Sequence, residues 1–71
     1  ELTVSEAYKI LELGITATFE QVKKRFRELA LKWHPDRNKA NKTQAEQMFV
    51  KINRAYETIL DNIATTPVNN L

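Results

Sequence analysis

The 71-residue sequence contains no cysteine, one glycine, two prolines and a single histidine. Without cysteine the chain can form neither a disulfide nor a thiolate zinc site, and it has no thiol nucleophile. One histidine argues against a histidine-based metal site, and one glycine excludes the dinucleotide-binding fingerprint and the P-loop. An all-β domain of this size would need several glycine-rich tight turns. These absences predict an all-α fold that uses no metal and no cofactor.

Long apolar runs are absent as well. No segment approaches the roughly 18 apolar residues of a membrane span, and no signal-peptide pattern is visible. We therefore expect no membrane contact from this segment, and the sequence specifies no compartment. Because the chain starts at Glu1 rather than at a methionine, we expect it to be part of a longer protein. Leu, Ile, Val and Phe account for 19 residues, enough for one small folded domain.

Three helix starts carry the same short pattern, a threonine followed three residues later by Glu or Gln. The pairs are Thr3–Glu6, Thr18–Gln21 and Thr43–Glu46. In such a capping box the hydroxyl accepts the third backbone N–H, and the longer side chain accepts the N–H of the threonine. Each pair precedes apolar residues at helical spacing. The pattern predicts helices near residues 4–12, 19–33 and 44–62.

Both longer predicted helices have one apolar face. In the helix over 19–33 this face comprises Phe19, Val22, Phe26, Leu29, Ala30 and Trp33. In the helix over 44–62 it comprises Ala45, Met48, Phe49, Ile52, Ala55, Tyr56, Ile59 and Leu60, with Ile63 just beyond. Two such helices joined by a polar loop are expected to form an antiparallel hairpin, with the short helix over 4–12 closing its open side. We expect a domain over 1–64 and a disordered tail or linker over 65–71.

Basic residues concentrate on the second predicted helix and the loop after it. This region holds eight of the 11 Lys and Arg residues: Lys23, Lys24, Arg25, Arg27, Lys32, Arg37, Lys39 and Lys42. At 100° per residue, Lys23 and Arg27 share one strip of the helix, and Phe26 borders it. Such a patch favours an acidic partner, either a protein or a phosphate backbone. The alternative is an ordinary solvated helix face.

His34, Pro35 and Asp36 stand where the second predicted helix meets the loop. Pro35 is expected to end the helix, because a residue that precedes proline is disfavoured in the α conformation. The imidazole and the carboxylate would then lie close together on an exposed corner that a partner protein could contact. The simpler interpretation is a solvated histidine before a helix-stopping proline and a turn-forming aspartate. A catalytic His–Asp pair would need a cleft and a nucleophile, which the sequence does not offer.

Three segments together resemble a J domain of the DnaJ type. They are Tyr8–Leu11, Val22–Asn38 and Phe49–Leu60. The second contains the His-Pro-Asp tripeptide and the third an Ala-Tyr pair, a combination far more specific than any one of these motifs alone. The resemblance covers residues 5–61. It implies a co-chaperone module that does no bond-breaking chemistry itself.

The resemblance also implies a partner and a set of interface residues. The partner would be a DnaK-type heat-shock chaperone, contacted at its ATPase domain near the interdomain linker and stimulated to hydrolyse ATP. The residues implied for this interface are His34, Pro35, Asp36, Lys23, Lys24, Phe26, Arg27 and Arg37. The His-Pro-Asp loop would be required for stimulation, and the basic helix face would dock electrostatically. We expect a monomeric domain that binds no nucleic acid.

Three features depart from the family pattern. In Leu11–Ile15 the glycine, Gly14, comes two residues later than usual, and we expect Leu13 to fill the apolar position. Arg25 stands where a small residue is common, and we expect it to reach past the packing seam to an acid. After Leu60 the sequence lacks the segment that usually forms a short fourth helix, with its Gln-Lys-Arg motif. The sequence therefore does not decide whether a fourth helix forms.

Two other functions stay open at this stage. A nucleic-acid-binding three-helix module would explain the basic helix, but Glu20 and Glu28 on that helix and a net charge of only +2 disfavour it. A J-like scaffold without a chaperone partner is disfavoured by the intact His-Pro-Asp tripeptide.

Overall fold

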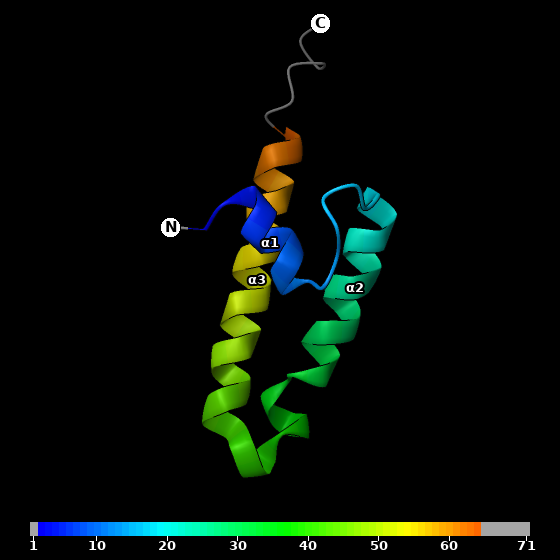
Figure 1. Cartoon of the computed structure of the whole chain (residues 1–71). Helices are drawn as coiled ribbons and strands as arrows, with labels where there is room; N and C mark the ends of the chain where they lie inside the picture. The colour runs from blue at the N-terminus through cyan, green and yellow to red at the C-terminus, as the bar shows by residue number, and fades with distance from the viewer. Residues whose placement is uncertain (1, 65–71) are drawn as a thin grey trace, which may run out of the picture.

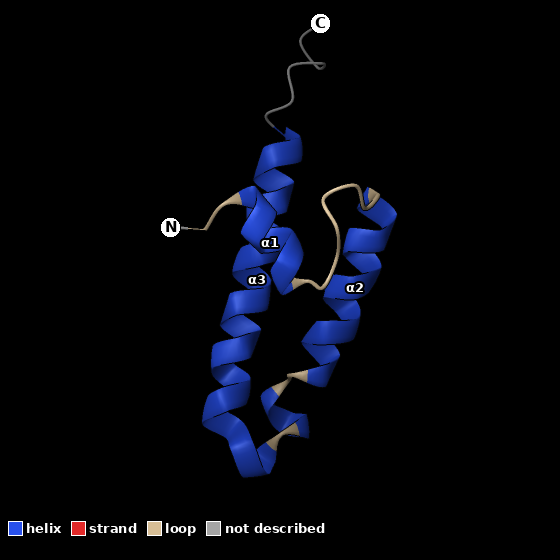
Figure 2. Ribbon diagram, viewed as in Figure 1, coloured by secondary structure: helices blue, strands red, loops and turns tan. Residues whose placement is uncertain are grey.

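A computed structural model describes residues 2–64, which form helices and no strands. The helices are α1 (Val4–Ile10), α2 (Phe19–Lys32) and α3 (Lys42–Ala64), and two short 3₁₀ turns, η1 (Pro35–Arg37) and η2 (Lys39–Asn41), join α2 to α3. Helices α2 and α3 run antiparallel, and α1 lies against α3 in the half remote from the connecting turns (Figures 1 and 2). The predicted all-α hairpin is confirmed.

The first two helices begin at the predicted capping boxes. The hydroxyl of Thr3 accepts the N–H of Glu6 at 3.1 Å, and a Glu6 carboxylate oxygen accepts the N–H of Thr3 at 3.0 Å. Thr18 and Gln21 exchange the equivalent bonds at 3.1 and 2.9 Å. The backbone bond from Thr3 lowers the pKa of Glu6 below its ordinary value, because it stabilises the ionised carboxylate.

The third predicted capping box is wrong. Helix α3 begins at Lys42, so Thr43 lies inside its first turn and not at its cap. The reason lies in η2, where the N–H of Asn41 already donates to the carbonyl of Asn38 at 3.0 Å. The chain is therefore turning helically before the threonine, and Lys42 has α-helical angles, φ −60° and ψ −42°.

Helix α1 ends two residues earlier than predicted, because Glu12 adopts a left-handed conformation with φ 62°. The N–H of Glu12 donates to the carbonyl of Lys9 at 2.8 Å, and the N–H of Leu13 donates to that of Tyr8 at 2.9 Å. This pair of bonds is a Schellman motif, which usually has glycine at the left-handed position. Leu13 packs against the core, as predicted.

The core lies where the three helices meet. Its fully buried side chains are Ala7, Leu11, Val22, Ile52, Ala55 and Ile59. Phe19 and Ile63, predicted for the apolar faces, are instead 41% exposed. Each lies in a terminal turn of its helix, where fewer neighbours pack against it.

Helix α3 continues through Ile63 to Ala64, two residues beyond the predicted end. No helix within residues 2–64 is both long enough and apolar enough to span a lipid bilayer. The predicted tail over 65–71 lies outside the described residues, and so does any fourth helix formed there.

Candidate functional site

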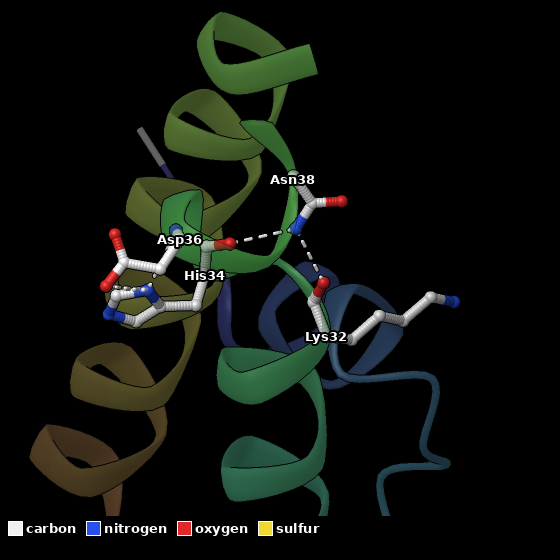
Figure 3. Close-up of polar contacts among 4 residues, drawn as sticks. All are labelled: Lys32, His34, Asp36 and Asn38. Atoms are coloured by element: carbon white, nitrogen blue, oxygen red, sulfur yellow. Dashed lines mark hydrogen bonds and ion pairs between the residues drawn. The ribbon is translucent and has the colours of Figure 1, made fainter. Parts of the chain in front are cut away.

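The His-Pro-Asp tripeptide forms a sharp corner directly after α2. His34 leaves the helical conformation, with φ −63° and ψ 134°, and Pro35 opens η1. The Nδ1 atom of His34 accepts the N–H of Asp36 at 3.2 Å and lies 3.9 Å from a carboxylate oxygen of that residue (Figure 3). Because Nδ1 is an acceptor here, the neutral imidazole carries its proton on Nε2. The predicted closeness of the imidazole and the carboxylate is confirmed, and the His34 side chain is 46% exposed and that of Asp36 88%.

Asn38 fastens this corner to the end of α2. Its amide nitrogen donates to the carbonyl of Lys32 at 2.8 Å and to that of His34 at 2.9 Å (Figure 3). Both carbonyls belong to the last turn or the exit of the helix, where backbone acceptors lack intrahelical partners. In the sequence, Asn38 is only the last residue of a motif. Its two amide donors and its preference for turns were the available signals.

Phe49 of α3 contacts the corner from the other side. Its ring lies edge-on to the imidazole of His34, with a centroid distance of 5.7 Å and an interplanar angle of 75°. Apolar spacing predicts Phe49 as a core residue, and its half-buried ring also supports the histidine. The corner is thus held by contacts to both long helices.

Four of the implied interface residues are basic, and they lie on α2 and η1. Lys24, Arg27 and Arg37 are exposed, whereas Lys23 is half-buried with its ammonium 5.3 Å from the centroid of the Phe19 ring. In the described part of the chain, no carboxylate lies within 4.0 Å of any of these four cations. Their charges are therefore available to an acidic surface.

Comparison with known proteins identifies the family of this chain. Residues 6–64 match the family model of the DnaJ domain. The chain belongs to the DnaJ-domain family. The predicted family membership is confirmed, and the family is one of co-chaperones.

Relatives of this DnaJ domain are identical to it at about half of the aligned positions. Chaperone protein DnaJ of Thermoplasma acidophilum is 54% identical over 54 residues, which are 76% of this chain and 15% of that protein. Chaperone protein DnaJ of Dichelobacter nodosus is 47% identical over 57 residues, 80% of this chain and 15% of that protein. Human DnaJ homolog subfamily B member 3 is 46% identical over 54 residues, 76% of this chain and 37% of that protein. The chain thus spans a minor part of each relative, and no solved structure matches it significantly.

Phe26 of the DnaJ domain is fixed by a stacked aromatic partner. Its ring lies parallel to that of Tyr56 on α3, with centroids 4.1 Å apart and planes 8° from parallel. Both rings are partly buried. The stack holds Phe26 against the core. The sequence predicts that Phe26 borders the basic strip of Lys23 and Arg27.

Arg25, a departure from the usual DnaJ-domain pattern, forms two ion pairs. Its guanidinium lies 3.0 Å from Glu12 on the turn after α1 and 3.3 Å from Glu28 on its own helix. Arg25 does pair with acids, but the predicted location past the seam with α3 is wrong, because neither acid belongs to α3. Glu12, one of these two acids, is also the left-handed residue that ends α1. The arginine at position 25 and the shifted glycine after α1 are therefore coupled departures from the family pattern.

Proposed function

We propose that this DnaJ domain binds a DnaK-type heat-shock chaperone and stimulates its hydrolysis of ATP through His34, Pro35 and Asp36. The observation that carries the proposal is the corner itself. Two polar side chains are presented to solvent in a fixed geometry, while Asn38 and Phe49 fasten the backbone and the imidazole that hold them.

Docking is the part of the function proposed for the basic face of α2. Lys23, Lys24 and Arg27, together with Arg37 on η1, would attract an acidic surface of the ATPase domain and its linker. Phe26 would add a fixed apolar edge at the border of that face. Charge complementarity of this kind mainly accelerates association and sets orientation, and it weakens as salt increases.

Stimulation is the part proposed for the corner. A domain that makes no covalent change in ATP can accelerate hydrolysis only by binding the reactive conformation of the chaperone better than the resting one. The N–H of the His34 ring and the carboxylate of Asp36 supply a donor and an acceptor for such selective contacts. Faster hydrolysis would promote client capture during protein folding.

A titrated single-turnover assay tests this division of roles. The chaperone is loaded with ATP, and the hydrolysis rate is measured against increasing concentrations of the domain. We expect the wild-type domain to raise the rate to a plateau and His34→Gln to remove this stimulation while its helicity and melting temperature stay unchanged. Full stimulation by a folded His34→Gln variant would contradict the role of the corner.

A further inference from the structure

A groove of about 390 Å³ lies between α1, the residue segment before it, and α3. It belongs to the side of the molecule where α1 lies against α3 (Figure 1). Its lining residues are Leu2, Glu6, Lys9, Ile10, Lys51 and Arg54. None of these belongs to the corner or to the basic face of α2, so the proposed chaperone contacts do not use the groove.

The groove gathers the remaining positive charge of the chain. Eight of the 11 basic residues lie on α2, in the connection after it and at Lys42, the first residue of α3, and the other three are Lys9, Lys51 and Arg54. All three line this one groove, although they come from two helices. All three are exposed, and among the described residues no carboxylate lies within 4.0 Å of their charged groups.

The one acid of the groove is already engaged. Glu6 accepts the backbone N–H of Thr3 at 3.0 Å, and this bond holds the pKa of its carboxyl below the ordinary value. Its carboxylate is thus committed to capping α1. Three cations and one carboxylate leave the lining with a net charge of +2, so the groove attracts a ligand of negative charge.

The floor of the groove is apolar. Leu2 and Ile10 are half-buried and pack against the edge of the hydrophobic core. An aliphatic side chain placed on them would lose contact with water at about 25 cal/mol for each Å² buried. A phosphodiester backbone brings no such side chain, whereas a protein segment can place one between two carboxylates.

A second, acidic hollow continues the groove along α3. It shares Leu2 and Arg54 with the groove and adds Glu57 and Asp61. Like charges repel, so an acidic ligand would extend from Arg54 toward Lys51 and not toward Asp61. The charge distribution therefore sets one direction for the occupant.

We propose that this basic groove binds an acidic segment of a partner protein that carries an aliphatic residue between its carboxylates. The aliphatic side chain contacts Leu2 and Ile10, and the carboxylates pair with Lys9, Lys51 and Arg54. Because the corner and the basic face of α2 lie elsewhere, the segment and a chaperone can bind at the same time.

Three short capped peptides test the chemistry in an NMR titration of the ¹⁵N-labelled domain. The first has the sequence Asp-Glu-Leu-Asp-Glu, the second replaces its acids by Asn and Gln, and the third replaces Leu by Ser. We expect saturable shifts at the amides of Leu2, Ile10, Lys51 and Arg54 with the first peptide, and affinity at least tenfold lower with each of the others. Equal binding of the neutral peptide, or shifts confined to α2, would overturn the proposal.

Charge reversal then distinguishes binding in the groove from nonspecific attraction of the acidic peptide to a positively charged domain. We expect Lys51→Glu with Arg54→Glu to weaken binding of the acidic peptide at least tenfold, and Lys39→Glu with Lys42→Glu, which makes the same change in net charge, to alter it less than twofold. Equal losses in the two variants would overturn the proposal. So would tighter binding of a single-stranded oligonucleotide of the same charge in the groove. No chaperone is present in these experiments, so their outcome is independent of the proposed co-chaperone function.

Discussion

Glu12 is held in a backbone conformation that glycine adopts without steric cost. A residue with a Cβ pays about 1 kcal/mol or more to enter the left-handed region, and Glu12 has φ 62°. Its exposed ion pair with Arg25, at 3.0 Å, offsets at most about 1 kcal/mol of that cost. The turn after α1 is therefore a place where this chain can gain stability.

Two substitutions of Glu12 distinguish the energetic cost of its backbone conformation from the contribution of its charge. Glu12→Gly and Glu12→Gln both remove the charge that faces Arg25, but only glycine relieves the left-handed conformation. We expect the free energy of unfolding in urea to be about 1 kcal/mol higher for Glu12→Gly than for Glu12→Gln. Equal stabilities would show that the conformation carries no strain.

Asn38 has a role that no sequence pattern predicts. Its amide joins the carbonyls of Lys32 and His34, so Asn38→Ala should loosen the corner without disturbing the core. We expect the variant to lose at least half of the maximal ATPase stimulation, with melting lowered only slightly. Asn41→Ala is the matched control, because that side chain lies in the same connection and makes neither bond. Equal effects of the two substitutions would contradict a specific role for Asn38.

At the scale of the helices, two threonines that look equivalent in the sequence occupy different positions. Thr18 caps α2, whereas Thr43 lies within the first turn of α3. Removing a capping hydroxyl costs about 1 kcal/mol, while alanine is well tolerated inside a helix. We expect Thr18→Ala to lower the free energy of unfolding by about that amount and Thr43→Ala to leave it nearly unchanged. A similar loss from Thr43→Ala would mean that it does cap α3.

Local chemistry explains which helix boundaries were predictable. The boxes at Thr3 and Thr18 fix their helix starts because each acts within three residues. The start of α3 escaped prediction because η2, a turn without a sequence signal of its own, leads directly into the helix. The end of α1 escaped because Glu12 is not a residue expected in the left-handed region.

Tertiary contacts explain what the sequence left open at the site. Pro35 was enough to predict the corner, because its effect on the preceding residue is local. The bonds of Asn38 to two carbonyls and the edge contact of Phe49 with His34 depend on how the loop folds back. No periodic pattern reports such contacts, so apolar spacing assigned Phe49 only to the core.

For the whole molecule, the net charge of +2 conceals two separate basic surfaces. One is the face of α2 proposed for chaperone docking. The other is the groove between α1 and α3 proposed for an acidic segment. The two surfaces share no residue, so substitutions on one should leave the other intact.

Charge reversal on α2 tests the docking surface. We expect Lys23→Glu with Arg27→Glu to weaken association with the chaperone, and to do so more at low salt than at high salt. At an ionic strength of 0.15 M charges are screened over about 8 Å, and at 0.01 M over about 30 Å. Affinity measured at both ionic strengths checks this. Unchanged affinity at low salt would contradict the docking assignment.

The proposed co-chaperone function makes a direct prediction for one rate constant. It is the rate of ATP hydrolysis in a single turnover of a DnaK-type chaperone, measured with and without a saturating concentration of the wild-type domain. We predict an increase of about tenfold or more, equivalent to lowering the barrier by about 1.4 kcal/mol. An unchanged rate with every cognate chaperone tested would contradict the proposed function.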